Sequence, residues 1–257
     1  MSIMDEEVSA TGWSVAPAWG ELRYSAELAR LLVDSRLRSP QRRADAAPVL
    51  LIPGFMAGDA SLGVMRAWLA RRGHPVATSG ILANVDCSAR SLQRLQARLA
   101  DFADESGEPV MIVGQSRGGA FARSLAVRHP ELVRGLVMLG SPVLNGLALS
   151  APVQRTVRWI AWLGDLGVPG VFSTGCRDGE CCSDFRAELL APLPAGVDAV
   201  AVYSRSDGVV DWRTCVDPHA QAVEVDSSHC GMSVHPDVYR VLEQALDGAV
   251  VEERLAA

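Results

Sequence analysis

Val110-Met-Ile-Val-Gly-Gln-Ser-Arg-Gly-Gly119 is the stretch of this sequence that says most about the fold. A short apolar run ends in the pattern Gly-x-Ser-x-Gly, and a helical pattern begins directly after it. A serine placed on a sharp strand-to-helix turn, the nucleophile elbow, requires this context. Glycines two residues before and after the serine avoid the clash that larger side chains would cause in so tight a turn. The segment therefore predicts that Ser116 is held strained at the end of a strand, with its hydroxyl exposed.

Strand-like and helical segments alternate on both sides of this turn. Continuous apolar runs bounded by turn residues predict strands buried on both faces, and a 3.6-residue apolar period predicts the helices between them. The expected strands are 49–52, 75–82, 109–113, 133–139, 199–203 and 222–225, and the expected helices are 59–72, 88–105, 117–129 and 236–246. This order predicts an α/β fold with a mainly parallel central sheet of about six strands and helices on both faces.

Two segments lie outside this alternation. Residues 1–48 are expected to be an N-terminal lead-in with one helix at 21–38. Residues 143–196 interrupt the rhythm with apolar helical pieces, which predicts an inserted lid or cap, or alternatively a long crossover with an extra helix. The α/β core is then formed by 49–142 and 197–257.

A serine hydroxyl needs a base to act as a nucleophile, usually an imidazole that is oriented by a carboxylate. His229 follows the last expected strand and is the candidate base, with His235 as the alternative. Asp207 follows the preceding strand and is the candidate carboxylate, with Asp211 as the alternative. The chain order Ser116, Asp207, His229 is the order that α/β-hydrolases use.

With these motifs the chain resembles the α/β-hydrolase superfamily, and within it the bacterial esterase and lipase branch that includes GPI-inositol-deacylase-like enzymes. The resemblance runs from about residue 49 to 246 and rests on Ile52-Pro-Gly-Phe55, Gly114-Gln-Ser-Arg-Gly-Gly119, Leu139-Gly-Ser-Pro142, Ser206-Asp-Gly208 and Ser228-His-Cys-Gly231. It implies the α/β-hydrolase fold without the two antiparallel strands that some members carry.

The resemblance also implies an oxyanion hole. Its two donors would be the backbone N–H groups of Phe55 and Arg117, with Met56 as the alternative to Phe55. Many lipases have His-Gly where this chain has Pro53-Gly54, so one possible side-chain contact is absent. The Arg117 guanidinium is expected near the mouth of the site, either paired with a carboxylate of the substrate or lid or in a structural role.

These residues predict a serine hydrolase that cleaves carboxylic esters through an acyl-enzyme intermediate. The apolar content of the expected lid favours a small-molecule ester with a hydrophobic acyl or alcohol group. An acyltransferase would use the same three residues, with another alcohol in place of water. A non-catalytic binding module on the same fold is the third hypothesis.

Composition narrows the function and the location. The net charge of −6 argues against a nucleic-acid-binding surface. All 24 basic residues are arginine, which excludes any mechanism that needs a lysine. No apolar run approaches the roughly 18 residues of a membrane span. Residues 1–10 are acidic where a secretory signal is basic and apolar, which predicts a cytoplasmic protein. The oligomeric state stays open.

The six cysteines are accordingly expected to be free thiols. Cys176, Cys181 and Cys182 cluster in the expected lid, but a zinc site needs a fourth ligand at suitable spacing, and none is evident. Neither a metal nor another cofactor is therefore expected. A disulfide between Cys215 and Cys230 would brace the loop of the candidate base, but the acidic N-terminus argues against it.

Overall fold

The computed structural model of the protein describes residues 15–38 and 40–248. The acidic segment 1–10 therefore lies outside the described residues. Six parallel strands form one central sheet in the order β2-β1-β3-β4-β5-β6, as the alternation of elements predicted. The strands are β1 Val49–Ile52, β2 Val76–Thr78, β3 Val110–Gln115, β4 Val133–Leu139, β5 Asp198–Tyr203 and β6 Gln221–Glu224.

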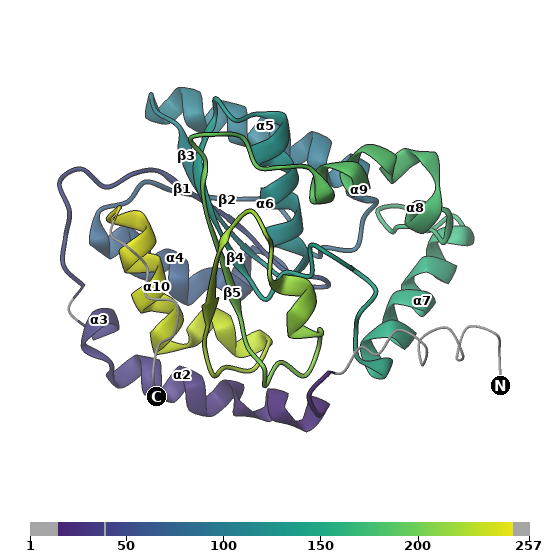
Figure 1. Ribbon diagram of the computed structural model, residues 1–257, viewed down its shortest axis with the longest axis horizontal. Helices are drawn as coiled ribbons and strands as arrows, with labels where there is room; N and C mark the ends of the chain where they lie inside the picture. The colour runs from purple at the N-terminus through teal and green to yellow at the C-terminus, as the bar shows by residue number, and fades with distance from the viewer. Residues whose placement is uncertain (1–14, 39, 249–257) are drawn as a thin grey trace.

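Helices cover both faces of this sheet (Figure 1). The α-helices are α2 Tyr24–Val33, α3 Ser35–Arg38, α4 Gly63–Arg72, α5 Ser88–Ser106, α6 Arg117–Arg128, α7 Ala151–Asp165, α8 Gly175–Asp178, α9 Ser183–Leu190 and α10 Pro236–Leu246. Short 3-10 helices are η1 Ala18–Arg23, η2 Asp59–Leu62, η3 Glu180–Cys182, η4 Trp212–Cys215 and η5 Cys230–Val234.

The central strands are apolar on both sides because each side faces a separate hydrophobic core. Every residue of β1 and β3 is buried. Successive side chains of a strand point to opposite faces, so Leu51 and Val113 enter the core under α2, α4 and α10. Leu50 and Ile112 enter the core under α5 and α6. The two layers of helices hold the carboxyl ends of the strands in fixed positions.

Two elements differ from the expected ones for local reasons. The expected helix at 21–38 is divided at Asp34, whose backbone is extended and whose side chain accepts a hydrogen bond from the N–H of Arg36 at 2.8 Å. Such a side-chain contact competes with helix continuation. The expected strand at 75–82 ends at Thr78, because the Asp59 carboxylate binds the next two backbone N–H groups, of Ser79 and Gly80.

Residues 140–197 connect β4 to β5 and contain α7, α8, η3 and α9, which lie together beside the sheet (Figure 1). The α9 end of this insertion is fastened to α6. The rings of Phe121 and Phe185 are 5.5 Å apart, and Arg123 donates to the carbonyl oxygens of Glu188 and Ala191. Among the residues described, no helix combines the length and apolar character needed to span a bilayer.

Candidate active site

Ser116 occupies the turn between β3 and α6 in a strained backbone conformation. Its φ of 52° and ψ of −120° are unusual for any residue other than glycine. A Cβ atom at Gly114 would lie 2.5 Å from the backbone of Gly118, and one at Gly118 would collide with the carbonyl oxygen of Ile52. The glycines of the Gly-x-Ser-x-Gly pattern are therefore required by close backbone packing around Ser116.

His229 and Asp207 come together from the loops that follow β6 and β5. The Nδ1 atom of His229 lies 2.6 Å from Oδ2 of Asp207, and both side chains are buried. The other carboxylate oxygen of Asp207 accepts hydrogen bonds from the backbone N–H groups of Val209 and Val210, at 2.8 and 2.9 Å. These bonds fix the carboxylate in the orientation that it presents to the imidazole.

Burial and charge act in opposite directions on His229. Burial lowers the pKa of the imidazole, but the negative charge of Asp207 and its hydrogen bond outweigh burial, so the pKa lies above its ordinary value of 6.5. Gly140, at the end of β4, leaves room for this pair. A Cβ there would lie 3.1 Å from Nδ1 of His229 and 3.3 Å from Oδ2 of Asp207.

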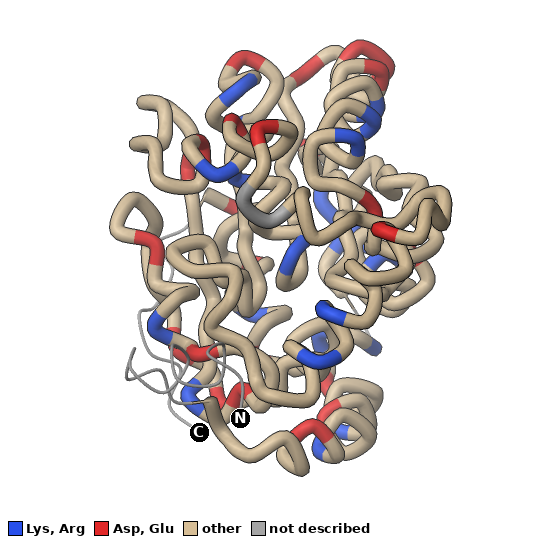
Figure 2. Tube along the Cα trace, turned by 90° about the vertical axis from the view of Figure 1, so that its right-hand side faces the viewer, with Lys and Arg blue, Asp and Glu red and all other residues tan. Residues whose placement is uncertain are grey.

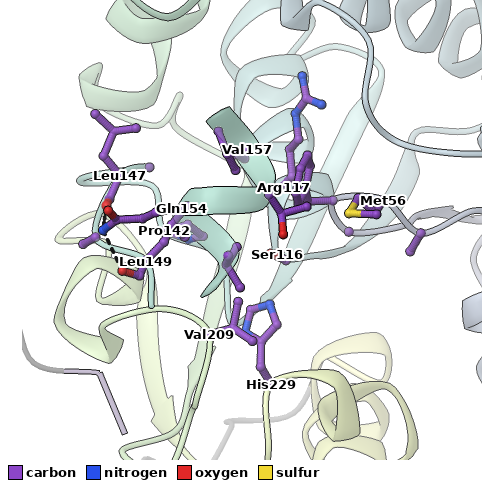
Figure 3. Close-up of a pocket in the computed structure, with 18 of the residues that line it drawn as sticks. Met56, Ser116, Arg117, Pro142, Leu147, Leu149, Gln154, Val157, Val209 and His229 are labelled. Carbon is purple, nitrogen blue, oxygen red and sulfur yellow. Dashed lines mark hydrogen bonds between the residues drawn. The ribbon is translucent and has the colours of Figure 1, made fainter. Parts of the chain in front are cut away.

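Ser116 and His229 line the same cavity, which has a volume of about 1300 Å³. Figure 3 shows the His229 ring beside Ser116, with side chains of the insertion forming the opposite wall. That wall is largely apolar and includes Leu147, Leu149, Val153, Val157, Phe172 and Phe185. The Ser116 hydroxyl, the imidazole–carboxylate pair and an apolar chamber thus lie at one place.

The two alternative residues are engaged elsewhere. Asp211 begins η4, where its carboxylate accepts from the backbone N–H of Arg213 at 2.9 Å and pairs with the guanidinium of that residue. His235 is buried at the start of α10, where Nδ1 accepts from the N–H of Asp237 at 3.3 Å. Of the two aspartates and two histidines considered, it is Asp207 and His229 that contact each other.

Arg117 is a structural residue of the cavity wall. Its guanidinium donates to the carbonyl oxygens of Asn84 and Asp86 and stacks between the rings of Phe121 and Phe172. Burial lowers the pKa of this guanidinium to about 10, although nearby negative groups oppose the shift. Figure 3 shows its side chain directed away from His229, so the structural role is the one that the contacts support.

The backbone near the expected oxyanion hole distinguishes Phe55 from Met56. The Met56 N–H already donates to the carbonyl oxygen of Asn84 at 3.3 Å. Met56 also has a positive φ of 60°, a strain that, among the non-glycine residues the structure describes, it shares with Ser116. The N–H of Arg117 is at the first position of α6, where a helix leaves its N–H groups without partners inside the helix.

A carboxylate from the N-terminal segment braces the loops of Asp207 and His229, and the sequence patterns did not reveal it. Oε1 of Glu21 accepts from the backbone N–H groups of Gly208 and His229, at 3.0 and 2.9 Å, and Oε2 accepts from that of Cys230 at 2.9 Å. Nothing in the local sequence marks Glu21 among other acidic residues, because its partners lie about 200 positions further along the chain.

Glu27, six residues further along the chain, makes a similar contact. Its carboxylate accepts from the backbone N–H and the hydroxyl of Ser228, at 2.8 and 2.6 Å, and its side chain is buried. Cys215 and Cys230 are both free thiols, so no disulfide braces the histidine loop. The N-terminal lead-in and helix, expected to lie outside the α/β core, therefore support the site through Glu21 and Glu27.

Comparison with known proteins agrees with this architecture. A lipase of Bacillus licheniformis, BlEst2 in its mature form, shares 17% identity with a TM-score of 0.61, over 80% of this chain and 94% of that chain. The metagenome-derived lipolytic enzymes LipS and LipT give a match at 17% identity and a TM-score of 0.57, over 79% of this chain and 94% of that chain.

The carboxylesterase CesB of Bacillus subtilis matches at 12% identity with a TM-score of 0.52, over 90% of this chain and all of that chain (100%). No family model and no curated protein matches the sequence. The chain has the α/β-hydrolase fold, and its structural neighbours include lipases and esterases. Placement in the bacterial esterase and lipase branch stays a prediction.

Proposed function

We propose that the protein is a serine hydrolase that cleaves carboxylic esters through an acyl-enzyme intermediate. Ser116 attacks the ester carbonyl, His229 takes the hydroxyl proton and returns it to the leaving alcohol, and Asp207 holds the imidazole and stabilises its protonated form. Water then attacks the acyl-enzyme with His229 as the base. The observation that carries this proposal is the strained Ser116 in one cavity with an imidazole whose Nδ1 lies 2.6 Å from Asp207.

The backbone N–H groups of Phe55 and Arg117 form the proposed oxyanion hole. Such donors stabilise the negative charge that develops on the carbonyl oxygen, by about 3 kcal/mol for each donor. The existing bond of the Met56 N–H to Asn84 favours Phe55 as the second donor. Arg117 follows β3 and Phe55 follows the neighbouring strand β1, so both candidate donors come from the same edge of the sheet as Ser116.

The substrate proposed is an ester with an apolar acyl or alcohol group. The wall formed by the insertion is lined with aliphatic and aromatic side chains, and these exclude water from the group they contact. The insertion is proposed to act as a cap over the bound substrate. Its aromatic residue Phe172 packs against Phe55 with ring centres 6.1 Å apart, directly beside the proposed oxyanion hole.

A cytoplasmic location and a lack of nucleic-acid partners belong to the same proposal. None of the six cysteines is joined in a disulfide, which suits a reducing compartment. Figure 2 shows acidic and basic positions interspersed along the described part of the chain, without a continuous basic face in that view.

The test is labelling with a fluorophosphonate probe, followed by hydrolysis of p-nitrophenyl esters of increasing acyl length. We expect a single adduct on Ser116, and neither labelling nor turnover in Ser116→Ala. Ser61→Ala removes another hydroxyl at the cavity and serves as the matched control, with labelling retained. An adduct on another residue, or turnover in Ser116→Ala, would refute the nucleophile.

The same experiment separates the three hypotheses. An added alcohol that captures most of the acyl group in place of water would identify an acyltransferase. A folded wild-type protein with neither labelling nor ester turnover would identify a non-catalytic binding module. Release of the free acid as the main product is the result expected for a hydrolase.

A further inference from the structure

Four cysteine thiols form a cluster beside the cavity, although one of the four residues is far from the others in sequence. Cys87 lies at the end of the loop between β2 and α5, whereas Cys176, Cys181 and Cys182 belong to α8 and η3 of the insertion. All four Sγ atoms lie within 4.8 Å of one another. Cys87 thus supplies the fourth thiol that the sequence did not reveal, 95 positions away from Cys182.

The spacing of these sulfur atoms suits a tetrahedral metal ion. A Zn–S bond of about 2.3 Å places the corners of a tetrahedron about 3.8 Å apart. Here the Sγ atoms of Cys87 and Cys182 are 3.6 Å apart, and those of Cys181 and Cys182 are 3.7 Å apart. Two disulfides would require only two short Sγ–Sγ distances among the four cysteines. A single ion requires all six Sγ–Sγ distances to be short, and all six are within 4.8 Å.

The surroundings of the cluster also suit a metal bound by thiolates. The guanidinium groups of Arg90 and Arg117 lie close enough to interact electrostatically with Cys87 and Cys176, and they would offset the net negative charge of a tetrathiolate zinc site. The Ser173 hydroxyl is 3.6 Å from the sulfur of Cys176, within hydrogen-bonding range for sulfur. Such contacts to a ligand atom orient it toward the metal.

The local backbone brings the three insertion cysteines together. A Cβ atom at Gly179 would collide with the carbonyl oxygen of Gly175, so this turn can close only around glycine. The tight turn places the thiol of Cys176 beside those of Cys181 and Cys182. Cys87 and Cys182 are buried, which limits competition from solvent at two of the four positions.

We propose that Cys87, Cys176, Cys181 and Cys182 bind one zinc ion that ties the insertion to the α/β core. Sulfur ligands select zinc over the hard cations that prefer oxygen. Four protein ligands leave no open position on the ion, so the site is structural and takes no part in the ester chemistry.

The ion would hold one wall of the cavity in place. Val85 belongs to the loop that ends at Cys87, and its carbonyl oxygen accepts a hydrogen bond from the N–H of Phe172 at 2.8 Å. Phe172 in turn stacks on Arg117, next to Ser116. Zinc at the cluster would therefore fix the distance between the insertion and the backbone that surrounds the candidate nucleophile.

Metal content of the wild-type protein tests this directly. The full chain is purified under reducing conditions without chelator, equilibrated with excess zinc, desalted and measured by inductively coupled plasma mass spectrometry. We expect one zinc per chain, and four additional thiols reactive with Ellman's reagent after a strong chelator is added. Cobalt in place of zinc should give the intense visible absorption of a tetrahedral thiolate site.

Three variants locate the ion. Cys87→Ser and Cys182→Ser should lose at least about nine-tenths of the zinc, because each removes a ligand from the buried side of the cluster. Cys230→Ser changes a cysteine outside the cluster and should keep the full zinc content.

Two results would overturn the proposal. One is wild-type protein that stays free of zinc after equilibration, with its thiols reactive. The other is an intact mass, measured without reductant, that is lower than the mass of the fully reduced chain by two hydrogens for each disulfide within the cluster. Both are read from the wild type, so they hold even where a variant fails to fold. Neither depends on ester turnover, so this proposal and the hydrolase proposal stand or fall separately.

Discussion

The carboxylate of Glu21 accepts a hydrogen bond from the backbone N–H of His229 at 2.9 Å, across 208 positions of sequence. The same carboxylate binds the N–H groups of Gly208 and Cys230. One side chain thus connects the loop of Asp207 with the loop of His229, and the helical segment η1 becomes a brace of the candidate site. This contact explains why two loops without regular structure keep a 2.6 Å separation between carboxylate and imidazole.

Replacing Glu21 with alanine should lower kcat by roughly 10- to 100-fold, with a smaller change in KM, because a small misplacement of a catalytic group is costly. Glu21→Gln keeps one acceptor oxygen and should be intermediate. The kinetics are measured together with the melting temperature. Glu105→Ala, on the exposed face of α5, is the control and should match the wild type. A loss of melting temperature with kcat unchanged would reduce Glu21 to a residue of stability alone.

Asp207→Asn should lower kcat by about 10⁴-fold, as loss of the orienting carboxylate does in other triads. Asp211→Asn should leave kcat within a fewfold of wild type, because the Asp211 carboxylate caps η4 and pairs with Arg213. Steady-state ester hydrolysis by the two purified variants is the measurement. If Asp211→Asn were the more damaging change, the assignment of the carboxylate would move to Asp211.

His229→Ala should reduce activity as severely as Ser116→Ala, because nucleophile and base act as one unit. His235→Ala should keep activity within a fewfold and lose about 1 kcal/mol of stability, since it removes an acceptor at the start of α10. Hydrolysis rates and thermal unfolding of both variants decide this. Near-normal turnover by His229→Ala would refute the triad as described.

The value of kcat/KM should fall on the acid side of the pH profile, and the midpoint of this acid limb should lie above pH 6.5. The reason is that the pKa of His229 is raised and only the neutral imidazole can accept the serine proton. Activity is therefore lost as the pH falls through this raised pKa. In Asp207→Asn the raising charge is gone and burial remains, so the limb should move to lower pH. The measurement is kcat/KM against pH with a fluorogenic ester, and an identical limb in both proteins would contradict the assignment.

Narrowing the cavity should change substrate preference rather than the chemical step. Val157→Trp places a larger side chain from α7 into the apolar wall. We expect kcat/KM for octanoate esters to fall by at least about tenfold relative to acetate esters, since burial of apolar surface contributes to binding of the long chain. Arg155→Trp, on an exposed part of α7, is the control. An unchanged chain-length profile would argue against the insertion as the acyl wall.

Much of the fold could be predicted from the sequence because local patterns encode it. The boundaries of β1, β4 and α10 agree with the apolar runs and turn residues of the sequence, and the strained turn at Ser116 follows from two glycines at fixed spacing. Each of these features depends on neighbours within a few positions. The candidate residues Asp207 and His229 could also be predicted from the sequence, because each follows a strand that ends at the same edge of a parallel sheet.

The sequence by itself thus determined the order of strands and helices and the position of Ser116 at the turn between β3 and α6. The tertiary structure alone showed that Asp207, rather than Asp211, contacts His229. It also placed the Arg117 guanidinium among backbone carbonyls and brought Cys87 to three distant cysteines. It also revealed Glu21 as a brace of the histidine loop. Contacts of this kind join residues separated by up to about 200 positions, and the packing of the whole sheet and its helices, rather than any local pattern, sets which of them meet.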